Sequence, residues 1–194
     1  TLTIQAGTQV LFRGNYTITA NGKLFVNGTP DNKVIFSSRM PVPAVGNWNN
    51  ITLNSGAVGS VIKYAVYKYA TDGFICNNLN QLTIWGCEVN TLAINARAIT
   101  LNNCENVDIR YNTLNIPGDW VIYKSGEDWD NSGVFIGNNI QAANNGMYIR
   151  RFSHLTVDSN TVQTTGQGIR TDYSRNMLCR YNTIAGQDHS IGIH

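Results

Sequence analysis

The chain has 194 residues, enough for one domain of ordinary size. Charged residues make up 13% of it, the formal net charge is +2, and no Lys/Arg cluster appears, which argues against a nucleic-acid binder that neutralises phosphates. No apolar run reaches the ~18 residues that a membrane span needs.

The N-terminal third predicts short strands separated by tight turns. Its opening, TLTIQAGTQVLF, alternates as a strand does, so no signal peptide is visible. Because Thr1 is not an initiator Met, we expect a mature or excised piece of something longer. The next signals are two Gly-centred turns, a Val/Phe strand, the start of a new coil and a further strand pair: Ala6–Thr8, Asn27–Thr29, Val34–Ser38, Gly46–Trp48 and Ile62–Gly73.

A repeat becomes visible in the second half of the chain. Its anchor is an Asn followed two positions later, in most copies, by an aliphatic residue. The anchors Asn112, Asn139, Asn160 and Asn182 are separated by 27, 21 and 22 residues, and Cys87 fits the same slot one unit earlier. Aliphatic residues recur before each anchor, so each unit repeats the same short strands and turns.

Each unit also contains a second short strand after its anchor. These strands begin at Gly73, Ala98, Trp120, Gly146, Gly168 and Ser190. No helical period of 3.6 appears, which excludes helical repeats and βαβ crossovers. No single unit buries an apolar face, whereas stacked units do so by placing strand on strand at about 4.8 Å. The sequence therefore predicts an all-β, right-handed parallel β-helix with three sheets and about eight coils.

The Asn anchors are expected in a turn between two sheets. There they would adopt the left-handed conformation and pass amide hydrogen bonds from coil to coil, forming a ladder of Asn112, Asn139, Asn160 and Asn182. The alternative is that Asn merely marks surface turns. The recurrence of position, rather than of composition, favours the ladder.

The turns and strands of the N-terminal third, with the Asn-anchored coils behind them, resemble a right-handed parallel β-helix family of secreted and cell-surface proteins of the pectin-lyase-like type. The resemblance covers nearly the whole chain. It implies the fold and a secreted or cell-surface location, but little about activity, because such families include polysaccharide lyases, hydrolases, epimerases, adhesins and structural stalks.

The outward face of the second strand predicts a candidate binding site. If Gly146 and Gly168 begin equivalent strands, residues two and four positions later point outward. In the C-terminal half these positions hold Lys124, Tyr148, Arg150, Arg170, Asp172 and His194. The resemblance implies that such a face forms a sugar-binding groove, where Arg and Lys would neutralise a uronate and Tyr148 would stack on a sugar ring.

A simpler interpretation of these charges is ordinary surface pairing. Arg150 and Asp172 are one coil apart in one column, as are Asp158 and Arg180 in another, and such pairs contribute only about 0.2–1 kcal/mol. No catalytic residue is therefore assigned. Trp85 follows an inward Ile and should face outward, which makes it a further candidate for ligand stacking.

Metal sites find little support in the sequence. The four Cys form no CxxC motif, so free buried thiols are expected for Cys76, Cys87, Cys104 and Cys179, with a Cys87–Cys104 bridge as an alternative. No Met/His cluster supports a metal-loaded periplasmic accessory protein. No cofactor is expected. The acidic segment 127–130 with Trp129 is interpreted as a solvated loop, with calcium or sugar binding as the alternative.

The leading functional hypothesis is an extracellular or cell-surface β-helix scaffold, structural or adhesive, with carbohydrate contact. Residues 1–194 would form one β-helix domain, a part of a longer chain or a fibre-forming unit. Expected partners are a polysaccharide or cell-surface glycan, and either further chain or another copy docked end to end. The alternative function is a carbohydrate-active enzyme, a lyase, hydrolase or epimerase, that uses the exposed sheet face.

Overall fold

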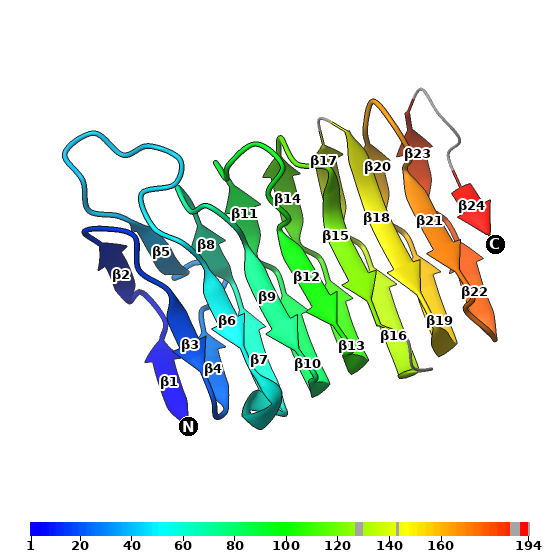
Figure 1. Ribbon diagram of the computed structural model, residues 1–194, viewed down its shortest axis with the longest axis horizontal. Helices are drawn as coiled ribbons and strands as arrows, with labels where there is room; N and C mark the ends of the chain where they lie inside the picture. Colours follow the sequence, from blue (N-terminus) through cyan, green and yellow to red (C-terminus); the bar gives the residue numbers. More distant parts are fainter. Residues whose placement is uncertain (127–129, 143, 187–190, 194) are drawn as a thin grey trace.

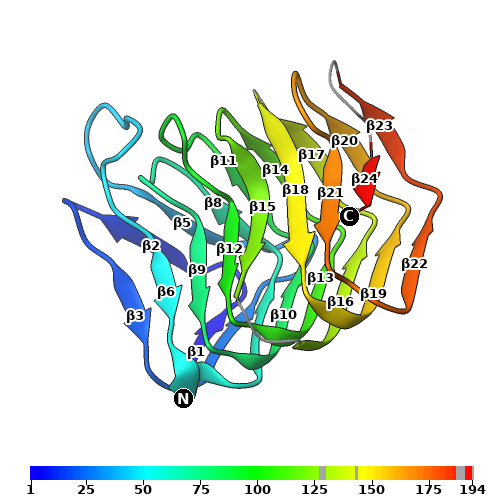
Figure 2. The ribbon, with the colours of Figure 1, turned by 45° about the vertical axis from the view of Figure 1, so that its right-hand side comes forward.

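The protein is a parallel β-solenoid, described by a computed structural model that covers residues 1–126, 130–142, 144–186 and 191–193. The chain passes through three eight-stranded sheets in turn, and every strand pairs with the equivalent strand of the next coil (Figure 1). Turning the molecule by 45° shows the coils stacked along one axis with the two termini at opposite ends (Figure 2). The predicted fold class, with its three sheets, is therefore confirmed.

The three sheets are labelled A, B and C in the order in which the chain meets them. Sheet A contains β1 Leu2–Gln5, β4 Leu24–Asn27, β7 Ser60–Lys63, β10 Asn80–Trp85, β13 Glu105–Arg110, β16 Asp130–Ile136, β19 Phe152–Asp158 and β22 Met177–Arg180. Sheet B contains β2 Gln9–Phe12, β5 Val34–Ser38, β8 Ala65–Tyr67, β11 Glu88–Asn90, β14 Thr113–Ile116, β17 Asn139–Ala142, β20 Thr161–Gln163 and β23 Thr183–Ala185. Sheet C contains β3 Ile18–Ala20, β6 Ile51–Leu53, β9 Phe74–Asn77, β12 Ile99–Asn102, β15 Trp120–Ser125, β18 Asn145–Arg150, β21 Ile169–Asp172 and β24 Ile191–Ile193. One short 3-10 helix, η1 Ser55–Ala57, precedes β7.

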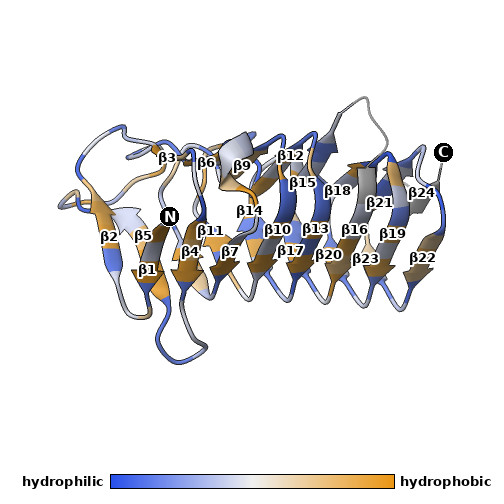
Figure 3. Cartoon of the chain, turned by 90° about the horizontal axis from the view of Figure 1, so that it is seen from below, coloured by the Kyte–Doolittle hydropathy of each residue, from blue (hydrophilic) through white to orange (hydrophobic). Residues whose placement is uncertain are grey.

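The core lies inside the solenoid and consists of stacked columns of aliphatic side chains. In sheet A, Ile62, Ile84 and Ile109 occupy paired positions on successive strands, and all three are fully buried. Burying each such side chain stabilises the fold by roughly 1.5–3 kcal/mol. Figure 3 shows hydrophobic stretches within the strands and hydrophilic ones in the turns that join them. One buried cluster runs from Ile4 to Ile169, so the coils share a continuous core.

Aromatic side chains pack together in the N-terminal part of this core. Trp48, predicted to pack inward, is fully buried. Its ring stacks on Phe12 with centroids 4.0 Å apart, and the ring of Tyr67 packs against it at a tilt of 43° with centroids 4.6 Å apart. The indole Nε1 donates to the carbonyl of Lys68 at 2.8 Å, so burial leaves no polar atom of this side chain unsatisfied.

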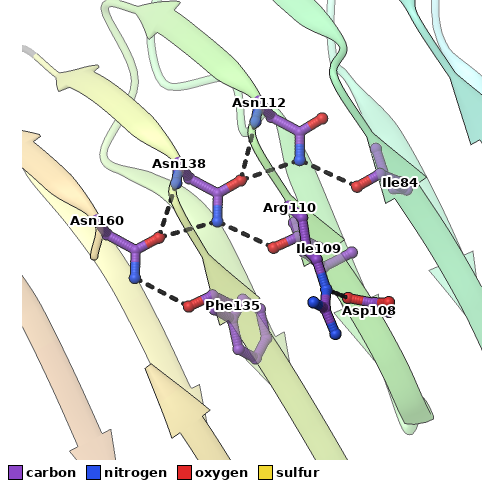
Figure 4. A network of polar contacts seen from close by, with 8 residues as sticks. All are labelled: Ile84, Asp108, Ile109, Arg110, Asn112, Phe135, Asn138 and Asn160. Carbon is purple, nitrogen blue, oxygen red and sulfur yellow. Dashed lines mark hydrogen bonds and ion pairs between the residues drawn. The ribbon is translucent and has the colours of Figure 1, made fainter. Parts of the chain in front are cut away.

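An asparagine ladder forms the corner between sheets A and B (Figure 4). Each buried side-chain Nδ2 donates to the Oδ1 of the Asn in the next coil at 2.9 Å and to a backbone carbonyl of the preceding coil. Each Oδ1 also accepts from the backbone N–H of the preceding rung. The rungs of this ladder are Asn112, Asn138, Asn160 and Asn182.

The second rung of the predicted ladder was wrong by one residue. Asn138, not Asn139, takes the buried position, because the turn residue Gly137 directly precedes it. Asn139 begins β17, is exposed, and pairs with Thr113 and Thr161 instead. The residue before each rung, rather than the Asn itself, adopts the left-handed conformation, with φ of 54° at Tyr111 and 64° at Gly137.

The ladder ends at the slot predicted for Cys87. The backbone N–H of Cys87 donates to Asn112 Oδ1 at 2.9 Å, as the backbone of each Asn rung donates to the next. The four cysteines are free thiols, so Cys87 and Cys104 do not form the alternative bridge. Cys76, Cys87 and Cys104 are buried, and Cys179 is half-buried.

Candidate functional site

The outer face of sheet C carries a column of side chains set by strand register. Thr100 of β12, Tyr123 of β15, Tyr148 of β18 and Arg170 of β21 occupy paired positions. Their neighbours, among them Ile122 and Met147, are fully buried on the inner face. Because side chains alternate between the two faces of a strand, this column points away from the core.

Three aromatic rings, those of Trp120, Tyr123 and Tyr148, gather on this face with two arginines, Arg97 and Arg170. We call these five residues the sheet C platform. Tyr148 lies at its centre, with its ring centroid 5.4 Å from that of Trp120 and 5.3 Å from that of Tyr123. The guanidinium of Arg97 lies 3.8 Å from the centroid of Tyr123, and that of Arg170 lies 5.4 Å from the centroid of Tyr148. The half-exposed rings therefore lie between two cations.

Asp172 fixes one side of the platform. Its carboxylate accepts from the Tyr148 hydroxyl at 2.9 Å and from Arg170 Nε and Nη2 at 3.1 and 3.0 Å. This is a bidentate arrangement, which restricts the guanidinium in orientation as well as position. Partial burial and then the hydrogen bond to Asp172 raise the pKa of Tyr148, so its hydroxyl stays a donor at neutral pH.

The platform contains Tyr148 and Arg170 of the predicted site residues, with Asp172 directly behind them. Arg150 is paired in register with Asp172, but its guanidinium lies 5.9 Å from the centroid of the Tyr173 ring. The carboxylate of Asp172 is held by Arg170 instead. The second predicted charge pair forms, with Arg180 Nε 2.8 Å from Asp158 Oδ2. His194 lies outside the described residues, as does the acidic segment 127–129 with Trp129.

Lys124 was placed on the wrong face. It is fully buried, it pairs in register with the inward Leu101, and its Nζ lies 5.1 Å from the centroid of the Phe152 ring. The error is a slip of one residue, because Trp120 pairs with Asn145 and not with Gly146. A slip of one residue moves every side chain of a strand to the opposite face.

The same slip hid the aromatic members of the site. With Trp120 aligned on Asn145, the outward position of β15 belongs to Tyr123 instead of Ile122. The sequence signal was present in WVIYK, where the aromatic residues are three positions apart around two aliphatic ones. Arg97 precedes β12, and its backbone N–H donates to Asp72 Oδ1 at 2.8 Å. The repeat pattern does not predict this contact.

Comparison with known families adds to this geometry. The profile of a family described as periplasmic copper-binding protein (NosD) matches residues 13–194. The chain belongs to the NosD family. NosD proteins are right-handed β-helix proteins of the pectin-lyase-like type, which confirms the resemblance inferred from the repeats. The periplasmic description confirms a location outside the cytoplasm.

Relatives of this NosD chain were also sought among curated proteins and solved structures. No curated protein and no solved structure gives a significant match. In the described part of the chain, no helical segment has the length and apolar character that crossing a bilayer requires. The family and the fold together make the chain an extracytoplasmic β-helix scaffold.

The family description names copper, and the described residues do not fit a copper ion. Across 1–126, 130–142, 144–186 and 191–193, no group of three or more His, Cys, Asp or Glu comes together. Copper favours thiolate, thioether and imidazole ligands. Burial raises the pKa of Cys76 well above its usual value and that of Cys87 to about 12, so both stay protonated. His189 and His194 lie outside the described residues.

Proposed function

We propose that this NosD protein is an extracytoplasmic scaffold whose sheet C platform holds an acidic carbohydrate chain. The observation that carries the proposal is the packing of Trp120, Tyr123 and Tyr148 between the guanidinium groups of Arg97 and Arg170. Flat half-exposed rings suit the C–H face of a sugar, because that face is weakly positive and the ring face is negative.

The charge of the platform supports an acidic ligand. Arg97, Arg170 and Arg150, whose charge acts on Tyr148, contribute three positive charges. Asp172, almost fully buried, and Asp72, which accepts from the backbone N–H of Arg97, contribute two negative charges. The surface therefore keeps an excess of positive charge beside the rings. A uronate carboxylate would meet the guanidinium groups while its ring lies on Tyr148 or Tyr123, which is the charge-assisted contact that Arg forms well.

A second part of the proposal concerns domain organisation. We propose that residues 1–194 behave as one domain, and the single buried cluster from Ile4 to Ile169 supports it. Thermal unfolding followed by circular dichroism and by calorimetry tests this point. Two well-separated transitions would contradict it.

The binding proposal is tested by titrating the protein with oligogalacturonate in a calorimeter at low and at high salt. We expect binding that weakens with salt, because the ligand charge is screened. Tyr148→Ala should reduce the affinity roughly ten-fold, since a ring contact is lost. Arg170→Ala should do the same. Assaying the same mixtures for unsaturated products or new reducing ends tests the enzyme alternative.

Arg180→Ala is the matched control for Arg170→Ala. Arg180 also pairs with an aspartate, Asp158, and also lies over a tyrosine, with its guanidinium 5.3 Å from the centroid of Tyr181. It belongs to sheet A, so its loss changes the net charge equally without touching the platform. Equal weakening by both variants would reduce the binding to non-specific charge attraction and contradict the proposal. Absence of any binding would do the same.

A further inference from the structure

A second aromatic surface lies at the corner between sheets A and B. A cleft of about 450 Å³ is lined there by residues of four successive coils, among them Lys33, Tyr64, Trp85, Gly86, Glu88 and Tyr111. None of its residues belongs to the sheet C platform. The cleft lies between β7, β10 and β13 on one side and the strands of sheet B on the other.

The tyrosines of the cleft are held in an uncommon backbone conformation. Tyr64, Gly86, Tyr111 and Gly137 occupy the same turn position in successive coils, with φ of 48°, 65°, 54° and 64°. Glycine adopts this left-handed region freely, whereas a bulky side chain is strained there. The same turn position holds Ser159 and Tyr181 outside the cleft, with φ of 55° and 54°, so this conformation belongs to the turn and sets the direction in which Tyr64 and Tyr111 project.

The alternation of tyrosine and glycine shapes the cleft. A Cβ built on Gly86 would lie 2.6 Å from Cε1 of Tyr64, and one on Gly137 would lie 2.5 Å from Cδ1 of Tyr111. Each glycine thus leaves the space into which the ring of the previous coil packs. The rings lie against the backbone, two coils apart, which corresponds to about 9.6 Å at 4.8 Å per coil.

Trp85 completes the aromatic wall. It is the last residue of β10, and its register partners are Lys63 of β7 and Arg110 of β13. Its ring centroid lies 5.3 Å from that of Tyr111, 6.0 Å from Lys63 Nζ and 5.8 Å from the Arg110 guanidinium. The indole was predicted to face outward, and in the structure it is half-exposed at this wall.

The charges around the cleft come mostly in opposite pairs. Lys33 and Glu88, which both line the cleft, form an ion pair with side chains 31% and 39% exposed. Arg110 is paired with Asp108 in the same way. These pairs supply hydrogen-bond donors and acceptors side by side without a net charge. A ligand whose hydroxyl groups both donate and accept fits such a pair, and a carboxylate would meet Glu88 unfavourably.

We propose that this corner cleft binds an uncharged pyranose unit of a glycan, independently of the sheet C platform. The C–H face of the sugar lies on Trp85 and Tyr111, and its hydroxyl groups bond to Lys33 and Glu88. A proline-rich peptide would also suit an aromatic wall, but it brings no side-chain donor or acceptor for the ion pair. The donor and acceptor of the Lys33–Glu88 pair therefore favour the sugar.

The experiment titrates the protein with cellotetraose, maltotetraose and chitotetraose, following tryptophan fluorescence and calorimetric heat. At least one of the three should bind and change the fluorescence. Trp85→Phe should remove the fluorescence change. Tyr111→Ala and Glu88→Gln should each weaken binding roughly ten-fold. Glu88→Gln keeps the shape of the side chain, so it remains informative if an aromatic variant folds poorly. Circular dichroism checks the fold of each variant.

Tyr181→Ala is the matched control, because Tyr181 has the same turn conformation as Tyr111, φ 54° in both, but lies outside the cleft. It should leave affinity unchanged, as should Tyr148→Ala on the platform, which separates this proposal from the one for sheet C. No binding by any of the three sugars would overturn the proposal. So would tighter binding of oligogalacturonate in the cleft, or binding of a proline-rich peptide without sugar binding.

Discussion

The sheet C platform and the corner cleft expose similar side chains, but their positions are set in different ways. On sheet C, Tyr123 and Tyr148 face outward only because of the strand pleat, so a shift of one residue would bury them. At the corner, Tyr111 is followed directly by the buried rung Asn112, whose side chain is bonded to both neighbouring coils. The difference teaches that the corner fixes its aromatic residues through the backbone, while the sheet fixes them through register.

The largest expected effect comes from cutting the ladder that anchors the corner. Asn138→Ala removes hydrogen bonds to Asn112, Asn160 and the carbonyl of Ile109, leaving buried polar groups without partners. The free energy of unfolding should fall by about 3 kcal/mol. Asn139→Ala, one residue further on and exposed, should change it by less than about 0.5 kcal/mol. Urea unfolding measures both, and similar losses in the two variants would argue against the ladder as anchor.

A smaller effect is expected from the turn position that the cleft shares with the glycines. Gly86→Ala places a methyl group 2.6 Å from the Tyr64 ring at a φ of +65°. It should destabilise the fold by about 1–3 kcal/mol through backbone strain and the displaced ring. Adding Tyr64→Ala should restore only the part due to the ring.

Gly22→Ala is the control for that substitution, because its methyl group would meet its nearest neighbour, the backbone nitrogen of Thr1, at an ordinary 3.9 Å. Thermal unfolding of the three variants measures the differences. A Gly86→Ala protein as stable as the parent would show that the backbone at the corner adjusts to the added methyl group. The corner would then not fix its aromatic residues through the backbone, as the comparison with sheet C supposes.

The smallest effect concerns the platform and appears at high pH. Burial and the hydrogen bond to Asp172 raise the pKa of Tyr148, so the phenol should ionise above its usual value of about 10. Because the folded-state pKa is the higher one, this contribution to stability is present below about pH 10 and is lost as the pH rises through the raised value.

Ultraviolet difference titration of the parent against Tyr148→Phe isolates this phenol. In Asp172→Asn the midpoint should move to lower pH, because the negative charge beside the phenol is gone. A midpoint that stays in place would separate Tyr148 from Asp172 and weaken the description of the platform as a fixed unit.

The fold could be predicted from the sequence because the residues that repeat from coil to coil are those at buried positions. Inward aliphatic residues and the rungs Asn112, Asn160 and Asn182 recur at spacings that only stacked coils explain. The misplaced rung arose at a pair of adjacent asparagines, 138 and 139, where composition gives no preference. Gly137 was the decisive signal, because the residue before each rung takes the left-handed conformation.

The candidate site was predicted less completely, for a related reason. Tyr148, Arg170 and Asp172 were found because Gly146 and Gly168, which directly precede the register pair Met147 and Ile169, mark equivalent positions in two successive coils. β15 has no glycine at that point, so Lys124 was assigned to the surface and Tyr123 was not identified. Packing decides such cases, since the ring of Tyr123 contacts Tyr148 only in the observed register.

The amide rows also give the solenoid a direction. In the buried row the hydrogen bonds between Asn side chains run toward the C-terminal coil, as from Asn112 Nδ2 to Asn138 Oδ1. A second row on the outer surface, from Asn21 through Asn54, Asn77 and Asn102 to Ser125, donates toward the N-terminal coil. The two lines of dipoles are therefore antiparallel and oppose each other's field along the axis, while bonds within each line polarise their neighbours. Removing the amide of one rung should accordingly weaken hydrogen bonds several coils away in its own row and leave those of the other row unchanged.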